Sequence, residues 1–293
     1  MIHKTLFTTK VSDGHSFRNT ICMFKNENPE ITLLVSAKGI SISFMNKGGN
    51  CIHDIDIRSE DLQYFSYNIA GLDFFPITVN TNQLLNMTKG VGRKDSIKIK
   101  WIEGWKRLII QIEKAGKASN RTSDSYVDII DRLYNKLDFI NNFTEEDACI
   151  KILSKEFSEI CAYISGIKCS YMEVVGNVNK ITFKGIMADG TIATTKDHIP
   201  YINSTDSYQG ANTAQIIDTV QDDECQLNIM KPEDSITIII PVVTVKAMSK
   251  LQNIAPPGAL LKLYFVQNKP LKIESVIGTY GNYNMYLKNP KKM

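Results

Sequence analysis

The sequence predicts an α+β fold built from two similar halves, each with helices on one face of antiparallel sheets. Residues 14–26 carry apolar side chains at the spacing of an amphipathic helix. In residues 38–60, apolar and polar side chains alternate on both sides of a loop at Gly48-Gly49, which is typical of two antiparallel strands. The same order of helix, strands, helix and strands returns in the second half of the chain, which indicates the duplication.

The first half is expected to hold two helices between strands. The helix over 14–26 turns Phe17, Ile21 and Phe24 to the core, and a short helix follows at 80–90. The expected strands are 31–36, 39–45, the stretch closing at Arg58, and a hairpin over 96–113 that turns at Glu103-Gly104.

The second half repeats this plan. A helix over 154–167 precedes strands at 170–175 and 180–185, and a helix over 241–255 turns Val243, Ala247 and Leu251 inward. The last strands are expected at 259–267 and 270–277. We therefore expect a domain at 1–127, a connector at 128–147 and a domain at 148–293, with a long loop at 202–226.

Composition excludes several classes of protein. The chain has 293 residues, 43% hydrophobic and 22% charged, with no apolar run long enough to span a membrane and no signal-peptide pattern at its start. The six cysteines are scattered without metal-ligand spacing, so we expect reduced thiols in an intracellular protein. A net charge of +3 is low for a protein held on nucleic acid by charge alone.

The order of features in residues 38–60 resembles the proliferating cell nuclear antigen family of sliding clamps. Lys38-Gly39 precedes a strand that ends at Met45, and after a polar loop the next strand closes in Arg58-Ser59-Glu60. Weaker matches follow in the right order at the first and second helices and at residues 149–161, 268–271 and 284–287. They cover most of the chain except 114–145 and 200–226.

The resemblance implies the DNA-clamp fold and a ring of three identical subunits joined head to tail. Helices would line the hole, and edge strands at 126–130 and 170–175 would pair between neighbours. Such a ring encircles duplex DNA, tethers a DNA polymerase and other replication and repair proteins, and is opened by a clamp loader. It catalyses nothing and needs no cofactor. Enclosure also explains the low net charge, because phosphate contacts that permit sliding must be weak.

Basic residues on the outward helix faces are the candidate DNA contacts. They are Arg18, Lys25, Lys89, Lys246 and Lys250. Any solvated helix face carries such residues, but the resemblance places Arg18, Lys25, Lys89 and Lys250 on the DNA side. In helix 154–167 the family has basic residues where this chain has Glu159 and Ala162, so contact there is in doubt; Lys155 shares that face and is included as a candidate.

A hydrophobic pocket for short partner peptides is the second implied site. The resemblance assigns to it Met45, Ile52, Pro270, Leu287 and Pro290, with Ile140 from the connector. A partner would insert a turn with aliphatic and aromatic anchors. The ordinary alternative for each residue is core packing, although the flexible thioether of Met45 suits a surface that accepts varied ligands.

Enzyme hypotheses find little support. The four histidines are far apart. His53, Asp54 and Asp56 superficially resemble a metal site, but on an alternating strand the side chains of His53 and Asp54 point to opposite faces.

Two alternatives to the homotrimer remain: a clamp-like processivity factor acting as monomer or dimer, and a checkpoint-type subunit that assembles with paralogues. The low glycine content and the richness in Lys, Asn and Ile suit an AT-rich genome such as that of a large DNA virus. The expected location is intracellular, in the nucleus or at a cytoplasmic replication site.

Overall fold

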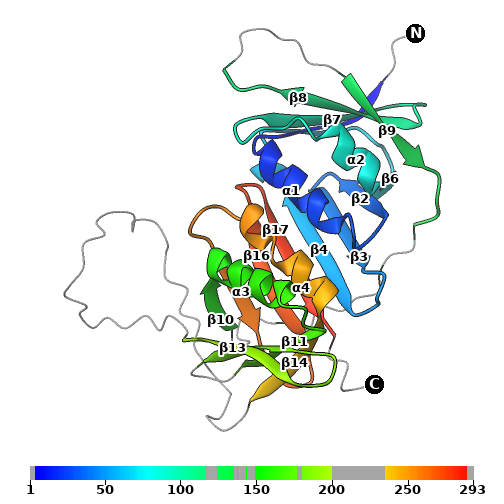
Figure 1. Cartoon of the computed structure of the whole chain (residues 1–293). Helices are drawn as coiled ribbons and strands as arrows, with labels where there is room; N and C mark the ends of the chain where they lie inside the picture. Colours follow the sequence, from blue (N-terminus) through cyan, green and yellow to red (C-terminus); the bar gives the residue numbers. More distant parts are fainter. Residues whose placement is uncertain are drawn as a thin grey trace.

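The computed structural model describes residues 4–116, 124–134, 137, 143, 149–176, 180–199 and 235–288. Ile140 and Pro290, the residues 202–226 expected to form a long loop, and most of the expected connector lie outside the described residues. The chain is shown in Figure 1.

The first half alternates strands with two α-helices. Its elements are β1 (Thr5–Val11), α1 (Gly14–Phe24), β2 (Glu30–Ser36), β3 (Gly39–Met45), β4 (Cys51–Arg58), η1 (Ser59–Asp61), β5 (Tyr64–Tyr67), β6 (Phe74–Asn80), α2 (Thr81–Met87), β7 (Ser96–Ile102), β8 (Arg107–Glu113) and β9 (Asp124–Ile130).

The second half follows the same order. Its elements are β10 (Cys149–Leu153), α3 (Ser154–Gly166), β11 (Tyr171–Gly176), β12 (Ile181–Ile186), β13 (Ile192–His198), β14 (Ile236–Pro241), α4 (Val242–Met248), η2 (Leu251–Asn253), β15 (Leu260–Tyr264), β16 (Leu271–Ile277) and β17 (Gly281–Leu287). Among the residues described, no helix is long and apolar enough to cross a membrane.

Strand order repeats between the halves. A 13-stranded sheet runs β10-β15-β16-β17-β4-β3-β2-β6-β9-β8-β7-β1-β5, and a four-stranded sheet runs β13-β12-β11-β14. The run β4-β3-β2-β6 in the first half therefore corresponds to β13-β12-β11-β14, and β1-β7-β8-β9 corresponds to β10-β15-β16-β17. This repeated topology confirms the prediction of two similar halves.

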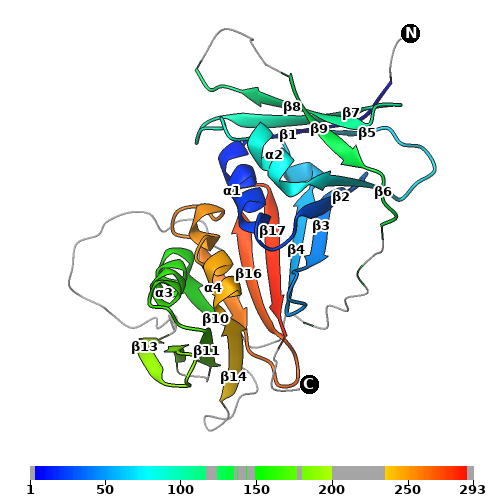
Figure 2. The ribbon, with the colours of Figure 1, turned by 45° about the vertical axis from the view of Figure 1, so that its right-hand side comes forward.

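One antiparallel strand pair joins the halves. β17 pairs with β4 from Asn282 opposite Asp56 to Leu287 opposite Cys51. Because β17 is the last strand of one half and β4 belongs to the other, the junction makes a continuous sheet across the chain (Figure 2).

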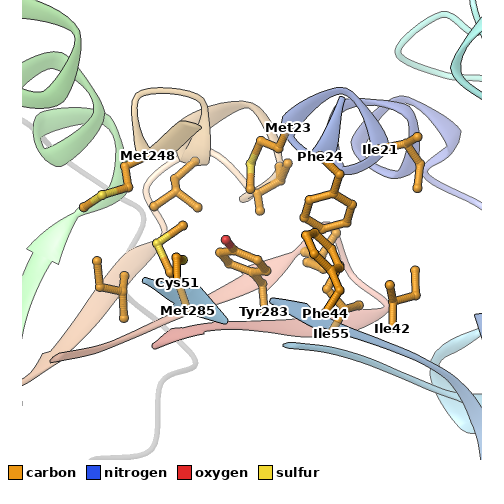
Figure 3. Close-up of a cluster of buried hydrophobic side chains, with 14 of the residues drawn as sticks. Ile21, Met23, Phe24, Ile42, Phe44, Cys51, Ile55, Met248, Tyr283 and Met285 are labelled. Atoms are coloured by element: carbon orange, nitrogen blue, oxygen red, sulfur yellow. The ribbon is translucent and has the colours of Figure 1, made fainter. Parts of the chain in front are cut away.

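The helices cover one side of this sheet. Figures 1 and 2 show α2, α1, α4 and α3 in one row, and α1 contacts both α2 and η2 while α3 contacts α4. Figure 3 shows Met23 and Phe24 of α1 and Met248 of α4 facing Phe44, Tyr283 and Met285 of the strands. Burial of these side chains against the sheet is the main force that fixes the helix positions.

Two sequence predictions about these elements are wrong. Val243 is predicted to face inward, but its side chain is exposed, because the buried stripe of α4 consists of Thr244, Val245, Ala247 and Met248. Ala247 and Leu251 are buried as predicted. The helix is also shorter than the 241–255 predicted: α4 ends at Met248, and the chain continues through the 3-10 turn η2 toward Pro256-Pro257.

The predicted edge strands need a correction as well. Residues 170–175 were expected at an edge, yet β11 lies between β12 and β14, and the outer strands of that sheet are β13 and β14. β9 pairs with β8 from Asp124 to Asp128, whereas only its last two residues pair with β6 on the other side. Within the described part of the chain, β13 and the first five residues of β9 thus present unpaired backbone.

Candidate functional site

The outward face of α1 carries the first candidate DNA contacts. The helix begins where the Asp13 carboxylate accepts a hydrogen bond from the Ser16 N–H at 3.0 Å, a standard N-cap. Its core stripe includes the predicted Phe17, Ile21 and Phe24, all buried. Arg18 and Lys25 lie off this stripe, so the helical period places both toward the side away from the sheet.

The candidate cations differ in their surroundings. Lys25, Lys89 and Lys246 are exposed, with no ion pair to any described residue. Lys250 is half-buried, and its Nζ lies 3.5 Å from the carbonyl oxygen of Cys22, so it bridges the second half to α1. Arg18 is half-buried too, and its Nε has no hydrogen-bond partner among the described residues.

Helix α3 adds little positive potential. Lys155 is exposed, but its Nζ lies 3.9 Å from the Glu159 carboxylate one turn later. Exposed Tyr163 occupies the same helix, with the Lys196 Nζ 5.6 Å from its ring centre. The row of helices is therefore more basic along α1 and α2 than along α3.

Sequence reasoning missed two basic residues near this face. Arg93 and Lys94 are exposed in the loop after α2. The loop is held beside the start of α1, because the Gly14 N–H donates to the Asp95 carbonyl at 3.0 Å. A hydrogen bond from Lys114 lowers the pKa of the Asp95 carboxyl, which also accepts from the Gly92 N–H. The sequence carries a signal for these two residues, because both closely follow a helix that is already assigned to this face.

The opposite face of the sheet holds the candidate partner site. Residues directly opposite each other across neighbouring strands share a face. Four such pairs define an outer row across β3, β4, β17, β16 and β15: Met45, Ile52, Tyr286, Lys272 and Tyr264. Met45 at one end is 42% exposed, and Ile52 is half-buried.

The connector reaches this outer row at one described residue. The Phe143 ring centre lies 5.9 Å from that of Tyr264 and 6.0 Å from that of Tyr286. The Nζ of Lys269, the residue before Pro270, lies 5.1 Å from the same ring centre. Pro270 is half-buried at the start of β16, so the structure brings it near the outer row. Phe143 lies close to the predicted Ile140 in sequence, but it was not predicted.

Leu287 does not join this face. It lies opposite Cys51, and Figure 3 shows Cys51 on the helix side of the sheet. Leu287 and Tyr286 are each 2% exposed, so the side of the sheet rather than burial separates them. Strand alternation gives the outer position to Tyr286, which the sequence analysis passed over. Met45, Ile52 and Pro270 thus lie together without Leu287.

Acidic side chains flank the outer row. Asp54, opposite Ser43 and Asn284, belongs to the same face. Burial and then the charge of Asp56 raise the pKa of the Asp54 carboxyl, against hydrogen bonds from Asn284 and Ser43. Burial also acts to raise the pKa of Glu274, but hydrogen bonds and charge from Lys272 hold it below its usual value.

The groups that resembled a metal site are separated by the sheet. His53 is fully buried on the helix side, and Asp54 and Asp56 lie on the other face. Burial lowers the pKa of His53 to about 3, so the ring is neutral at ordinary pH. No cluster of three or more His, Cys, Asp or Glu within the described ranges could hold a metal ion.

Two similar halves, a row of helices on one side and sheets on the other are the architecture of the DNA sliding clamps, and this chain has that fold. Two solved structures show it. Proliferating cell nuclear antigen from Entamoeba histolytica is 14% identical, with a TM-score of 0.74, and the match covers 98% of this chain and 99% of that one. A complex of PCNA2 with PCNA3 from Sulfolobus tokodaii is 15% identical, with a TM-score of 0.71, covering 97% and 100%. No family model matches the sequence, and no curated protein does.

Proposed function

We propose that this chain is a DNA sliding clamp, a processivity factor that encircles duplex DNA and tethers a DNA polymerase and other replication and repair proteins. It acts as an intracellular scaffold rather than as an enzyme. Its domains are 1–127 and 148–293, joined by the connector 128–147, whose first residues, 128–130, complete strand β9. Its partners are duplex DNA, a clamp loader and proteins that dock short peptides on the outer row.

The junction between β17 and β4 carries this proposal. By the repeated topology, β9 corresponds to β17, and β13 corresponds to β4. Within one chain β17 and β4 are paired with each other, whereas β9 and β13 have unpaired backbone groups in the described residues. A β9 of one subunit paired with the β13 of the next would repeat the internal junction and continue the sheet head to tail until a ring closes.

The register of this expected pairing follows from the repeat. In β8 and β9, the first directly opposed residues whose side chains face the helices are Leu108 and Val127. In β16 and β17, the corresponding residues are Leu271 and Leu287. Tyr126, the residue before Val127 in β9, therefore corresponds to Tyr286, the residue before Leu287 in β17. Likewise the pair Ile186–Ile192, which lies beyond a register shift between Gly185 and Ile186 at the start of β13, takes the place of Met45–Ile52. Tyr126 should therefore meet Ile192 of the neighbour, as Tyr286 meets Ile52 inside the chain.

Charge supports enclosure rather than adhesion. The cations of the helix row are spread along α1, α2 and α4, and the chain carries a net charge of only +3. A few exchangeable phosphate contacts per subunit would centre a duplex without fixing it.

Topology of the DNA gives the test. The protein is added at low salt to linear duplex with free ends, and the ends are then either blocked or left open before the salt is raised; a closed circle, onto which a ring cannot thread without a loader, is the third substrate. At high salt a ring should be retained only on the duplex whose ends were blocked after threading, because it slides off open ends. Equal retention on all three substrates, falling steeply with salt, would instead indicate the rival that grips DNA by charge as a monomer or dimer.

A heteromeric ring is the second candidate, because one of the structures with this fold is a complex of two different subunits. In that case the edges at β9 and β13 would select a paralogue. The purified chain would then stay monomeric at high concentration.

A further inference from the structure

A buried carboxylate lies between the two candidate surfaces. Glu27, shortly after α1, is 3% exposed, and its backbone N–H donates to the Phe24 carbonyl at 2.9 Å. Its Oε2 accepts a hydrogen bond from the Asn46 Nδ2 at 3.1 Å. The His53 Nε2 lies 3.9 Å from the same oxygen, but with a pKa near 3 the ring is neutral, so this is a polar contact and not an ion pair.

Asn46 organises the loop that follows Met45. Its Oδ1 accepts hydrogen bonds from the backbone N–H groups of Asn50 at 3.2 Å and Cys51 at 3.1 Å. Its Nδ2 also donates to the Asn50 Oδ1 at 2.9 Å. The loop 46–51 is also closed by backbone hydrogen bonds from the Asn46 N–H to the Cys51 carbonyl at 2.8 Å and from the Gly49 N–H to the Asn46 carbonyl at 2.9 Å. The Asn46 side chain adds its three hydrogen bonds to these, and Glu27 is the group outside the loop that fixes that amide.

Glu27 holds the loop by its backbone as well. The Lys47 N–H donates to the Glu27 carbonyl at 3.2 Å. On the far side of the loop, the Asn50 carbonyl accepts a hydrogen bond from the Lys288 N–H at 2.9 Å, where the chain leaves β17. The loop is thus fixed between α1 and the C-terminal strand, with Met45 and the outer row directly beside it.

The surroundings explain why a carboxylate can be buried here. Burial raises the pKa of Glu27, whereas the Asn46 hydrogen bond and the charge of Lys250 act to lower it. An isolated buried charge would be costly, so the donor and the nearby cation are what make the position tolerable. No role in DNA or peptide contact is available to Glu27 itself, because it is covered on both sides.

We propose that Glu27 is a positioning residue of the partner site: through Asn46 it sets the loop 46–51, and so the place of Met45 in the outer row. The proposal rests on the proposed function for the meaning of the site, but the loop geometry can be tested without any partner.

The experiment compares Glu27→Ala and Glu27→Gln in the full chain. Gln keeps an acceptor oxygen for the Asn46 amide, whereas Ala removes it. Hydrogen exchange at the Asn50 and Cys51 amides should become about tenfold faster in the Ala variant and stay near wild type in the Gln variant. The ¹³C-methyl resonance of Met45 should shift in the Ala variant alone. Glu30→Ala, which removes a carboxylate paired with Arg132 at the surface, is the matched control.

The second readout is affinity for a synthetic peptide that carries a short turn with aliphatic and aromatic anchors. Glu27→Ala should weaken its binding severalfold, and Glu27→Gln should restore it. The proposal is overturned by unchanged exchange and an unmoved Met45 signal, by a Gln variant that behaves like Ala, or by exchange that accelerates equally in β11 and β12. If wild type binds no such peptide while the loop responds as expected, the proposed function fails and the structural role of Glu27 stands.

Discussion

Ile52 of β4 lies directly opposite Tyr286 of β17, in the strand pair that joins the two halves of the chain. The same two residues form the middle of the outer row to which partner peptides are expected to bind. The candidate partner site therefore spans the internal junction, and a peptide bound there would contact both halves. The expected contact between subunits repeats this junction. The same kind of strand pairing would therefore form both the partner site and the ring.

The subunit contact predicts the effect of Tyr126→Ser. Tyr126 is 39% exposed and Ile192 is 60% exposed in the single chain, and both should be covered in the ring. Loss of an aromatic anchor at an interface costs about 2 kcal/mol or more, so the variant should dissociate at concentrations where wild type remains assembled. Sedimentation velocity measures this. Tyr64→Ser, which removes an exposed tyrosine from β5, a strand separated from β9 by β8, β7 and β1, should leave the assembly intact.

Charge reversal on the helix row should weaken DNA-dependent activity. We expect Lys25→Glu with Lys89→Glu to reduce the stimulation of a DNA polymerase, because both side chains are exposed and unpaired among the described residues. Lys250 is better changed to Gln, since Glu there would add a second negative charge beside Glu27. Adding Lys250→Gln should lower the stimulation further.

The control for the double charge reversal is Lys4→Glu with Lys38→Glu, at exposed positions outside the helix row. The two double variants change the net charge of the chain equally. Full stimulation by the triple helix-row variant would remove these residues from the DNA site.

Polar substitutions in the outer row should abolish peptide binding. Met45→Asp with Ile52→Asp places two carboxylates in the apolar part of the row, next to Asp54, where they would be poorly solvated once a peptide covers them. Calorimetric titration with the anchor peptide measures the loss. Val276→Asp, an exposed apolar position on the same sheet face but near the other end of β16, should bind normally. Peptide affinity unchanged by the double substitution would place the pocket elsewhere.

The buried His53 predicts a loss of stability in mild acid. Its pKa is about 3 in the folded chain and 6.5 in the unfolded chain, so the unfolded state binds the extra proton between these values. The free energy of unfolding should therefore fall as the pH drops below 6.5, by about 2 kcal/mol from this group at pH 5. Glu27, whose pKa is raised, acts in the opposite direction and offsets part of the loss.

Urea denaturation at pH 7 and pH 5 separates the two groups. His53→Gln should keep a polar contact to the Tyr283 hydroxyl, which now lies 2.7 Å from the His53 Nδ1, and should lose much of the pH dependence. The same pH dependence in both proteins would show that His53 is not the group responsible.

The local sequence pattern predicted most helices and strands, but it did not predict which strands lie beside one another in the sheets. Alternation in β3 and β4 correctly placed Ile40, Ile42 and Ile55 in the core, and helical spacing did the same for Ile21. Which strand lies at an edge depends on pairing between distant segments, so nothing within residues 170–175 could show that β11 is interior.

The candidate sites were predictable to the extent that they follow one strand or one helix. Met45 and Ile52 lie together because a short loop joins their strands, and the sequence shows that loop. Tyr286 and Leu287 differ by one residue, and a one-residue error in matching the last strand exchanges the two faces of the sheet. The positioning role of Glu27 could not be predicted from the sequence, because its side chain contacts Asn46 only when α1 packs beside β3.

Molar mass in solution, measured by light scattering across a range of concentrations, tests the central claim most directly. The account predicts a closed ring of three chains of 33.0 kDa each, about 99 kDa, with no larger open polymers. A mass that stays at 33.0 kDa at every concentration would contradict the homotrimeric ring.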